Sequence, residues 1–232
     1  MIWRWAIFFK IAVTAWCATV SGRVDLTDSK MADARGADDS GVVVWLEPAT
    51  GSAAATPPGT ATMMHKNKTF VPHVVAIRSG SKISFPNHDP FFHNAFSNYD
   101  GQMFDIGLHP PGSAREVTFR RPGIVRVFCN IHPTMSAVIV VLDTPYFATT
   151  NTQGLFQITA VPAGDYRLKV FHERALPDVL SALERQVTVG SEDMALPGIS
   201  ISEASYLVPP HKNKYGKDYP AVVVDQYPGR KP

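Results

Sequence analysis

Cysteine is scarce in this sequence, because only Cys17 and Cys129 occur among its 232 residues. Cys17 lies at the edge of an apolar N-terminal run, so a disulfide between the two would require that run to be retained. We therefore expect no disulfide and expect Cys129 to be a lone thiol. In an oxidising compartment an exposed lone thiol is a liability unless a partner such as a metal ion holds it.

Charge of one sign is also scarce. The 22 lysine and arginine residues nearly balance the 20 aspartate and glutamate residues, for a formal charge of +2 at pH 7. Such a balance supplies no strong field for a polyanion, so we expect no nucleic-acid partner. The sequence also has no G-x-S-x-G motif, no glycine-rich phosphate loop and no convincing Ser/His/Asp set. We therefore expect that the protein is not an enzyme.

The N-terminus lacks a hydrophobic run long enough to span a bilayer, which needs roughly 20 apolar residues. Residues 1–17 read MIWRWAIFFKIAVTAWC, in which Arg4 precedes the apolar run and Lys10 interrupts it. Val13-Thr14-Ala15 fits a small-x-small cleavage pattern. We predict a signal peptide over 1–17, a periplasmic or otherwise exported protein, and no stable membrane insertion of the mature chain. An uncleaved anchor and a buried first strand are the alternatives.

Helix-favouring runs are few, whereas proline (19) and glycine (16) are plentiful, which predicts an all-β protein of short strands. Strand-like runs rich in valine, isoleucine and phenylalanine follow one another from residue 19 to residue 142. Their number predicts one two-layer Greek-key sandwich over residues 18–143. The predicted strands are Thr19–Leu26, Val42–Leu46, Thr69–Ile77, Lys82–Pro86, Arg115–Phe119, Val125–Cys129 and Ala137–Leu142.

A second, smaller β-unit is predicted over residues 144–205. Residues 146–173 alternate apolar and polar side chains around a turn at Gln153-Gly154, which is typical of a hairpin or meander. Residues 175–185 are expected to form one or two helical turns. Residues 206–232 are rich in proline and lysine and have little periodicity, so we predict a loosely ordered tail.

One segment carries most of the chemical information. Val125–Val141 reads VRVFCNIHPTMSAVIVV and places Cys129, His132 and Met135 at the spacing C-x2-H-x2-M between two predicted strands. A tight loop between strands can turn all three side chains towards one point. His93 precedes Cys129 by 36 residues and follows another strand, so the two can meet at one pole of a Greek-key sandwich. Thiolate, imidazole and thioether donors together indicate a blue-copper centre.

The pattern of His-Asn followed by C-x2-H-x2-M resembles the cupredoxins, especially amicyanin and plastocyanin-like proteins and methylamine-utilisation-like proteins. In that family the matching positions are ligands of one type 1 copper ion. The resemblance implies that the three strong ligands are His93, Cys129 and His132, and that Met135 is the long axial ligand. It also implies that Asn94 buttresses the cysteine loop and can hydrogen-bond the ligand sulfur.

The resemblance extends over roughly residues 19–143 and implies an exported protein that carries single electrons. Its partners would be redox proteins such as a c-type cytochrome or a dehydrogenase, and we expect a monomer. One alternative is a copper-binding module for copper delivery or storage, which the neighbouring Met63, Met64 and His65 would favour. Another is a structural sandwich in which the site takes no metal.

The second unit resembles the carboxypeptidase regulatory-like, transthyretin-like sandwiches. Its stretch TTNTQGLFQITAVPAGDYRLKVFHE has a turn glycine, an aromatic-apolar strand and then P-x-G-x-Y, which Pro162, Gly164 and Tyr166 match. The resemblance implies a fold but no activity.

The remaining histidines are interpreted more plainly. His88 and His109 lie in predicted turns near the proposed metal site, and we expect both to be solvated loop residues. Met63, Met64 and His65 are expected to be a coincidental cluster, because adjacent residues of a strand point to opposite faces.

Overall fold

A computed structural model describes residues 17–28, 38–53, 56–98, 101–204 and 211–220 of the chain. Residues 1–16 of the predicted signal peptide lie outside this range. Cys17, its predicted last residue, is the first residue of a strand. No helix within the described residues is long and apolar enough to cross a membrane.

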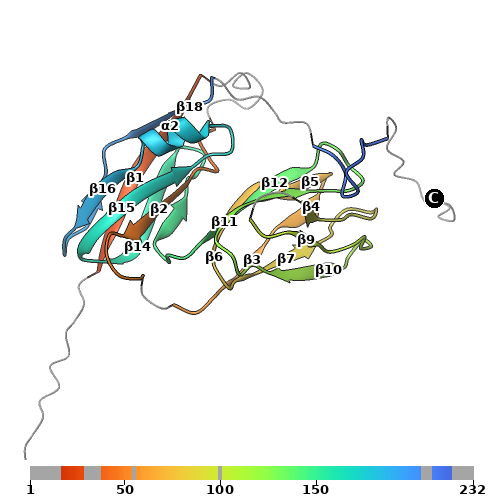
Figure 1. Ribbon diagram of the computed structural model, residues 1–232, viewed down its shortest axis with the longest axis horizontal. Helices are drawn as coiled ribbons and strands as arrows, with labels where there is room; N and C mark the ends of the chain where they lie inside the picture. Colours follow the sequence, from red (N-terminus) through yellow and green to blue (C-terminus); the bar gives the residue numbers. More distant parts are fainter. Residues whose placement is uncertain (1–16, 29–37, 54–55, 99–100, 205–210, 221–232) are drawn as a thin grey trace, which may run out of the picture.

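The described residues form two all-β lobes that lie side by side (Figure 1). In the first lobe, sheets of strand order β10-β7-β3 and β6-β12-β11-β8-β9 are accompanied by the β4-β5 hairpin. The strands are β3 (Thr60–Thr62), β4 (Met64–Lys66), β5 (Thr69–Val71), β6 (Val74–Arg78), β7 (Lys82–Pro86), β8 (Phe96–Ser97), β9 (Phe104–Asp105), β10 (Ala114–Thr118), β11 (Gly123–Phe128) and β12 (Ser136–Leu142).

The second lobe has two four-stranded sheets, one of order β14-β1-β17 with β18 also pairing to β1, and one of order β13-β2-β15-β16. One short helix, α2 (Pro177–Ala182), lies where one or two helical turns were predicted. The strands are β1 (Cys17–Thr27), β2 (Val43–Pro48), β13 (Phe147–Thr149), β14 (Leu155–Pro162), β15 (Gly164–Phe171), β16 (Arg185–Val189), β17 (Met194–Ala195) and β18 (Ile199–Ser202).

The strand pairing corrects the predicted extent of the first sandwich, residues 18–143, at its N-terminal side. The runs 19–26 and 42–46 were predicted to be strands of the first sandwich, but β1 pairs with β14 and β2 pairs with β13 and β15. The second lobe therefore combines strands from both sides of the first lobe in the sequence. Alternating burial identifies a strand but does not identify its partner, which is why the sequence pattern assigned these strands to the nearer sandwich.

Strand β12 joins the two lobes through its two faces. The run SAVIVVL is apolar throughout rather than alternating, and six of its seven residues are buried. Ala137, Ile139 and Val141 pack in the core of the first lobe. Val138 and Val140, on the other face, pack with residues of the second lobe that include Val43 and Phe171. A continuous apolar strand is expected where both faces of a sheet are covered.

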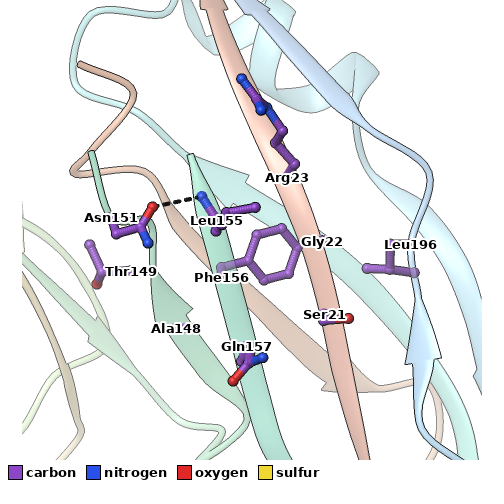
Figure 2. Close-up of a pocket in the computed structure, with 10 residues that line it drawn as sticks. All are labelled: Ser21, Gly22, Arg23, Ala148, Thr149, Asn151, Leu155, Phe156, Gln157 and Leu196. Atoms are coloured by element: carbon purple, nitrogen blue, oxygen red, sulfur yellow. Dashed lines mark hydrogen bonds between the residues drawn. The ribbon is translucent and has the colours of Figure 1, made fainter. Parts of the chain in front are cut away.

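The second lobe requires a glycine where two of its strands meet. Gly22 of β1 pairs with Phe156 of β14, and the Phe156 ring lies against Gly22 (Figure 2). A Cβ atom at residue 22 would come within 2.6 Å of Phe156 Cζ. This position lies beside an open groove of about 710 Å³, which is lined by Ser21, Arg23, Asn151, Gln157 and neighbouring residues. The groove contains no cluster of metal-ligating or nucleophilic side chains.

Of the predicted tail, residues 206–232, the structure describes residues 211–220, which form no regular element but are held by specific contacts. They lie against the first lobe, at the end that carries the loop between β11 and β12, and are drawn in dark blue (Figure 1). Their side chains hydrogen-bond to that loop, which contains Cys129, His132 and Met135. A polar, proline-containing sequence does not reveal that its partner lies some 90 residues earlier in the chain.

Candidate metal centre

Two strands and one turn carry the predicted ligand loop. β11 and β12 pair antiparallel as far as Phe128 and Ser136, and Cys129 follows directly on β11. The Cys129 amide donates to the Met135 carbonyl at 3.2 Å, and the Met135 amide donates to the His132 carbonyl at 3.1 Å. The hairpin thereby folds the C-x2-H-x2-M motif into a turn at the end of the sandwich.

The structure brings three predicted ligands together. The ligand atoms of His93, Cys129 and His132 lie within 4.8 Å of one another, and all three residues are buried. Cys129 Sγ lies 3.8 Å from His93 Nδ1 and 3.6 Å from His132 Nδ1. His93 reaches the site from the segment before β8. Met135 is buried at the end of the same loop and packs in the same core as Cys129.

The histidines favour the thiolate form of Cys129. Burial alone raises the pKa of the thiol, because a charge is poorly solvated in the core. Hydrogen bonds from His132 and His93, and from the backbone amides of Ile131 and His132, outweigh this effect and lower the pKa from 9.0 to about 6. The thiolate is the form that binds a metal ion, so the site is prepared for one at neutral pH.

Asp89 orients the ring of His93. The His93 Nε2 atom lies 2.8 Å from Asp89 Oδ2, and both side chains are buried. The bond to Asp89 holds Nε2 and turns Nδ1 towards Cys129 Sγ. Burial raises the pKa of Asp89, but hydrogen bonds from the Lys68 amide, the His93 ring and the Asn67 amide lower it overall, so the carboxylate is ionised.

Asp89 is a functional residue that the sequence prediction missed. It stands four residues before His93 in HDPFFH. A carboxylate that accepts a hydrogen bond from a metal-binding histidine is common in metalloproteins, because it fixes the ring and raises its basicity. That spacing is the one signal in the sequence that was available to find it.

Asn94 lies where a buttress for the cysteine loop was predicted. Its Oδ1 atom accepts a hydrogen bond from the Asn130 amide at 3.3 Å, directly after Cys129. Its Nδ2 atom donates to Asp105 Oδ1 at 2.7 Å. Asn94 therefore connects the residue after one predicted ligand, His93, to the residue after another, Cys129.

His109 and His65 correct two of the sequence predictions. His109, predicted to be a solvated loop residue, is fully buried, whereas His88 is exposed as predicted. His65 is also fully buried, and its ring stacks on the ring of His93 with centroids 4.9 Å apart and planes 6° apart. Burial, together with the nearby His93 and His109, lowers the pKa of His65 to about 3, so the stacked ring is neutral. Of the group Met63, Met64 and His65, His65 therefore contacts a predicted ligand directly.

The outer side of the site is covered by an aromatic ring and edged by lysines. Phe91 lies 5.6 Å from His132 and 5.2 Å from His93 between ring centroids. His132 is only 3% exposed. The Lys68 ammonium lies 5.4 Å from the centroid of the Phe91 ring. Lysines near this end of the lobe are Lys66 and Lys68 on the β4-β5 hairpin, and Lys212, Lys214 and Lys217 on residues 211–220.

Comparison with known proteins finds similarity to copper proteins over part of the chain. No family model matches the sequence. A curated relative, the methylamine utilization protein MauL of Methylorubrum extorquens, is 40% identical over 55 residues, which are 23% of this chain and 48% of that protein. The chain thus spans about half the length of the curated relative that it matches.

Solved structures that resemble this chain include three copper proteins. A Cu-containing nitrite reductase from Thermus scotoductus is 28% identical over 41% of this chain and 25% of that chain, with a TM-score of 0.35. A purple cupredoxin from Nitrosopumilus maritimus is 20% identical over 35% of this chain and 99% of that chain, with a TM-score of 0.33. Amicyanin from Paracoccus versutus is 19% identical over 43% of this chain and 97% of that chain, with a TM-score of 0.34.

Proposed function

We propose that the first lobe binds one copper ion through His93, Cys129 and His132, with Met135 as a fourth, weaker ligand, and that it transfers single electrons. The convergence of two histidine Nδ1 atoms on one buried thiolate carries this proposal. Two imidazoles, one thiolate and one thioether form the donor set of a blue-copper site. Zinc is a poorer fit, because structural zinc sites rarely use methionine.

The distances between the donor atoms fit a single ion. Thiolate and imidazole ligands bind a divalent ion such as zinc at about 2.0 to 2.3 Å. At a trigonal angle, a thiolate and an imidazole at these distances lie about 3.7 to 3.8 Å apart. The distances from Cys129 Sγ to His132 Nδ1 and to His93 Nδ1 are 3.6 and 3.8 Å. The two sulfur–nitrogen distances are therefore compatible with one bound ion, and all three ligand atoms lie within 4.8 Å of one another.

The surroundings of the site favour electron transfer over catalysis. Copper supplies one-electron chemistry because it alternates between Cu(I) and Cu(II). His93, Cys129, His132 and Met135 would occupy all four positions, whereas catalytic metal sites keep one open for substrate. Asp89 and Asn94 restrain the ligands, and Phe91 keeps water from the imidazoles. A restrained, dry site limits the reorganisation that accompanies electron transfer.

The partner would be a redox protein, such as a c-type cytochrome or a dehydrogenase, in the periplasm or an equivalent exported space. His132 and Phe91 form the covered edge of the site, from which the distance to a docked partner is shortest. Among the described residues, the five lysines near this end outnumber three acidic residues, Asp89, Asp105 and Asp218, and the last two each pair with a lysine. An acidic partner surface therefore fits this end of the lobe, because opposite charges speed diffusional encounter.

A visible spectrum after addition of Cu(II) tests the proposal. We expect an intense thiolate-to-copper band that bleaches reversibly with a mild reductant. The Cys129→Ala variant should lose the band entirely, because the thiolate is removed. Cys17→Ala is the matched control and should keep it, since Cys17 is exposed on β1 in the other lobe. A folded protein without the band would exclude type 1 copper.

Copper delivery or storage is less well supported. That alternative was favoured by Met63, Met64 and His65, but Met63 and His65 are fully buried in the first lobe and cannot present ligands at the surface. The two functions differ in a simple measurement. An electron carrier retains its copper through repeated cycles of reduction and oxidation, whereas a delivery protein releases Cu(I) to an acceptor.

A further inference from the structure

Residues 211–220, here called the C-terminal segment, hydrogen-bond to both ends of the predicted ligand loop. The Tyr219 hydroxyl donates to the Cys129 carbonyl at 2.8 Å. The His211 Nε2–H group donates to the Pro133 carbonyl at 2.8 Å. Cys129 is itself a predicted ligand, and Pro133 directly follows the predicted ligand His132. The segment therefore contacts the loop on both sides of the stretch from Cys129 to His132.

Ring contacts hold the C-terminal segment in place. The His211 ring stacks on Phe128, the last residue of β11, with centroids 4.1 Å apart and planes 26° apart. The Tyr219 ring meets the His211 ring edge-on at 5.3 Å. The aromatic surface before Cys129 is therefore covered by the same residues that bind the loop carbonyls.

A second set of contacts involves Lys214, which bonds to Asn130 and to Asp105, the two partners of Asn94. The Lys214 amide donates to Asn130 Oδ1 at 3.0 Å, and its ammonium group lies 2.7 Å from Asp105 Oδ2. The other oxygen of Asp105 accepts from Asn94 Nδ2 at 2.7 Å. The Lys214 hydrogen bond and the Asn94 hydrogen bond lower the pKa of Asp105, although burial opposes them. The segment thus contacts Asn130, which follows Cys129, and is linked through Asp105 to Asn94, which follows His93.

We propose that the C-terminal segment is part of the metal site, with Tyr219 and His211 as positioning residues of the ligand loop. The Tyr219 and His211 hydrogen bonds satisfy carbonyls that would otherwise require water. They also connect the ligand loop to the C-terminal segment. Without them the loop opens more often and exposes Cys129. The effect on bound copper rests on the proposed function, whereas the effect on the loop does not.

The direct test uses the full-length, metal-free protein with Cys17→Ala, in which Cys129 is the only thiol. The rate of Cys129 labelling by a thiol reagent reports loop opening. Tyr219→Phe loses only the hydroxyl, and with it the bond to the Cys129 carbonyl and a longer contact of 3.4 Å with His211 Nδ1. Labelling should be about fivefold faster, as expected for loss of one ordinary hydrogen bond. Tyr215→Phe is the matched control, because Tyr215 is 69% exposed, and its labelling rate should not change.

Urea separates loop opening from global unfolding. If the loop opens locally, the labelling rate of Tyr219→Phe stays constant with urea below the unfolding transition. His211→Ala should behave in the same way, because it removes the bond to Pro133 and the stack on Phe128. Labelling of Tyr219→Phe at the rate of Tyr215→Phe, or only through global unfolding, would overturn the proposal.

The copper-loaded protein gives a second readout. Relative to Tyr215→Phe, the Tyr219→Phe variant should show a shifted thiolate-to-copper band and lose Cu(II) several-fold faster to a chelator. If the parent protein has no band, the proposed function fails, and the labelling rates still decide whether the segment positions the loop. If the parent has the band and the variants match it in spectrum, metal release and labelling, the segment is not part of the site.

Discussion

The two lobes enclose similar apolar cores but differ in the polar groups that they bury. The second lobe buries few polar side chains, and two of them, His172 and Glu203, bond to each other. The first lobe gathers buried polar side chains at one end, including His65, Asp89, His93, Asn94, His109 and His132. Burying polar groups is costly unless they are bonded. The proposed function therefore rests on the first lobe, where the buried polar side chains surround the predicted ligands.

The contrast also appears in how each lobe is stabilised. In the second lobe the close contact of Phe156 with Gly22 is steric. Hydrogen bonds connect distant segments in both lobes, but at the end of the first lobe they run from Asp89 through Asn94 to the C-terminal segment, beside the predicted ligands. Substitutions should therefore change stability in one lobe and the metal site in the other.

The largest expected effect compares a core residue from each lobe. Leu168→Ala removes a fully buried side chain of β15 and should lower the free energy of unfolding by about 2 to 5 kcal/mol. Met135→Leu nearly conserves volume and should cost less than about 1.5 kcal/mol. Urea unfolding of the metal-free proteins measures both.

The effect on the copper spectrum should be larger for Met135→Leu than for Leu168→Ala, which is the opposite of the order expected for stability. Met135→Leu removes the thioether and should shift the thiolate-to-copper band and the reduction potential. Leu168→Ala should leave both unchanged at temperatures where it is folded. A copper spectrum altered by Leu168→Ala and left unchanged by Met135→Leu would contradict the division of labour between the lobes.

The sequence predicts the ligand loop well because the information is local. Cys129, His132 and Met135 lie within seven residues, and strand-forming residues flank them on both sides. The turn therefore follows from the pattern alone. His93 was placed near them by its position after a strand in a Greek-key sandwich, and the structure brings its Nδ1 atom to 3.8 Å from the sulfur.

Long-range pairing explains what the sequence did not reveal. The apolar runs in β1 and β2 predict strands, but their partners β14 and β15 lie more than 100 residues later. Tyr219 reaches Cys129 across 90 residues without any motif that links them. His109 was predicted to be exposed because proline and glycine follow it, yet a bridge to His93 buries it.

An intermediate effect is expected from Asp89, which sharpens the contrast within the first lobe. Asp89→Asn keeps the size of the side chain but replaces an ionised acceptor of the His93 Nε2–H bond with a neutral one. Loss of such a carboxylate typically weakens metal binding 10- to 100-fold. Competition with a chelator of known affinity measures the change. Asp165→Asn, on β15 of the second lobe, is the matched control and should leave the affinity unchanged.

The smallest expected effect concerns the lysine that lies over Phe91. Lys68→Gln removes one positive charge near the covered edge of the site and keeps a side chain of similar length. Electron exchange with the anion hexacyanoferrate should slow about two- to threefold at low salt, and the difference should vanish near 1 M salt, where the screening length is about 3 Å. Lys169→Gln in the second lobe controls for net charge. Equal slowing by both variants would show that total charge, rather than the surface around His132, governs encounter.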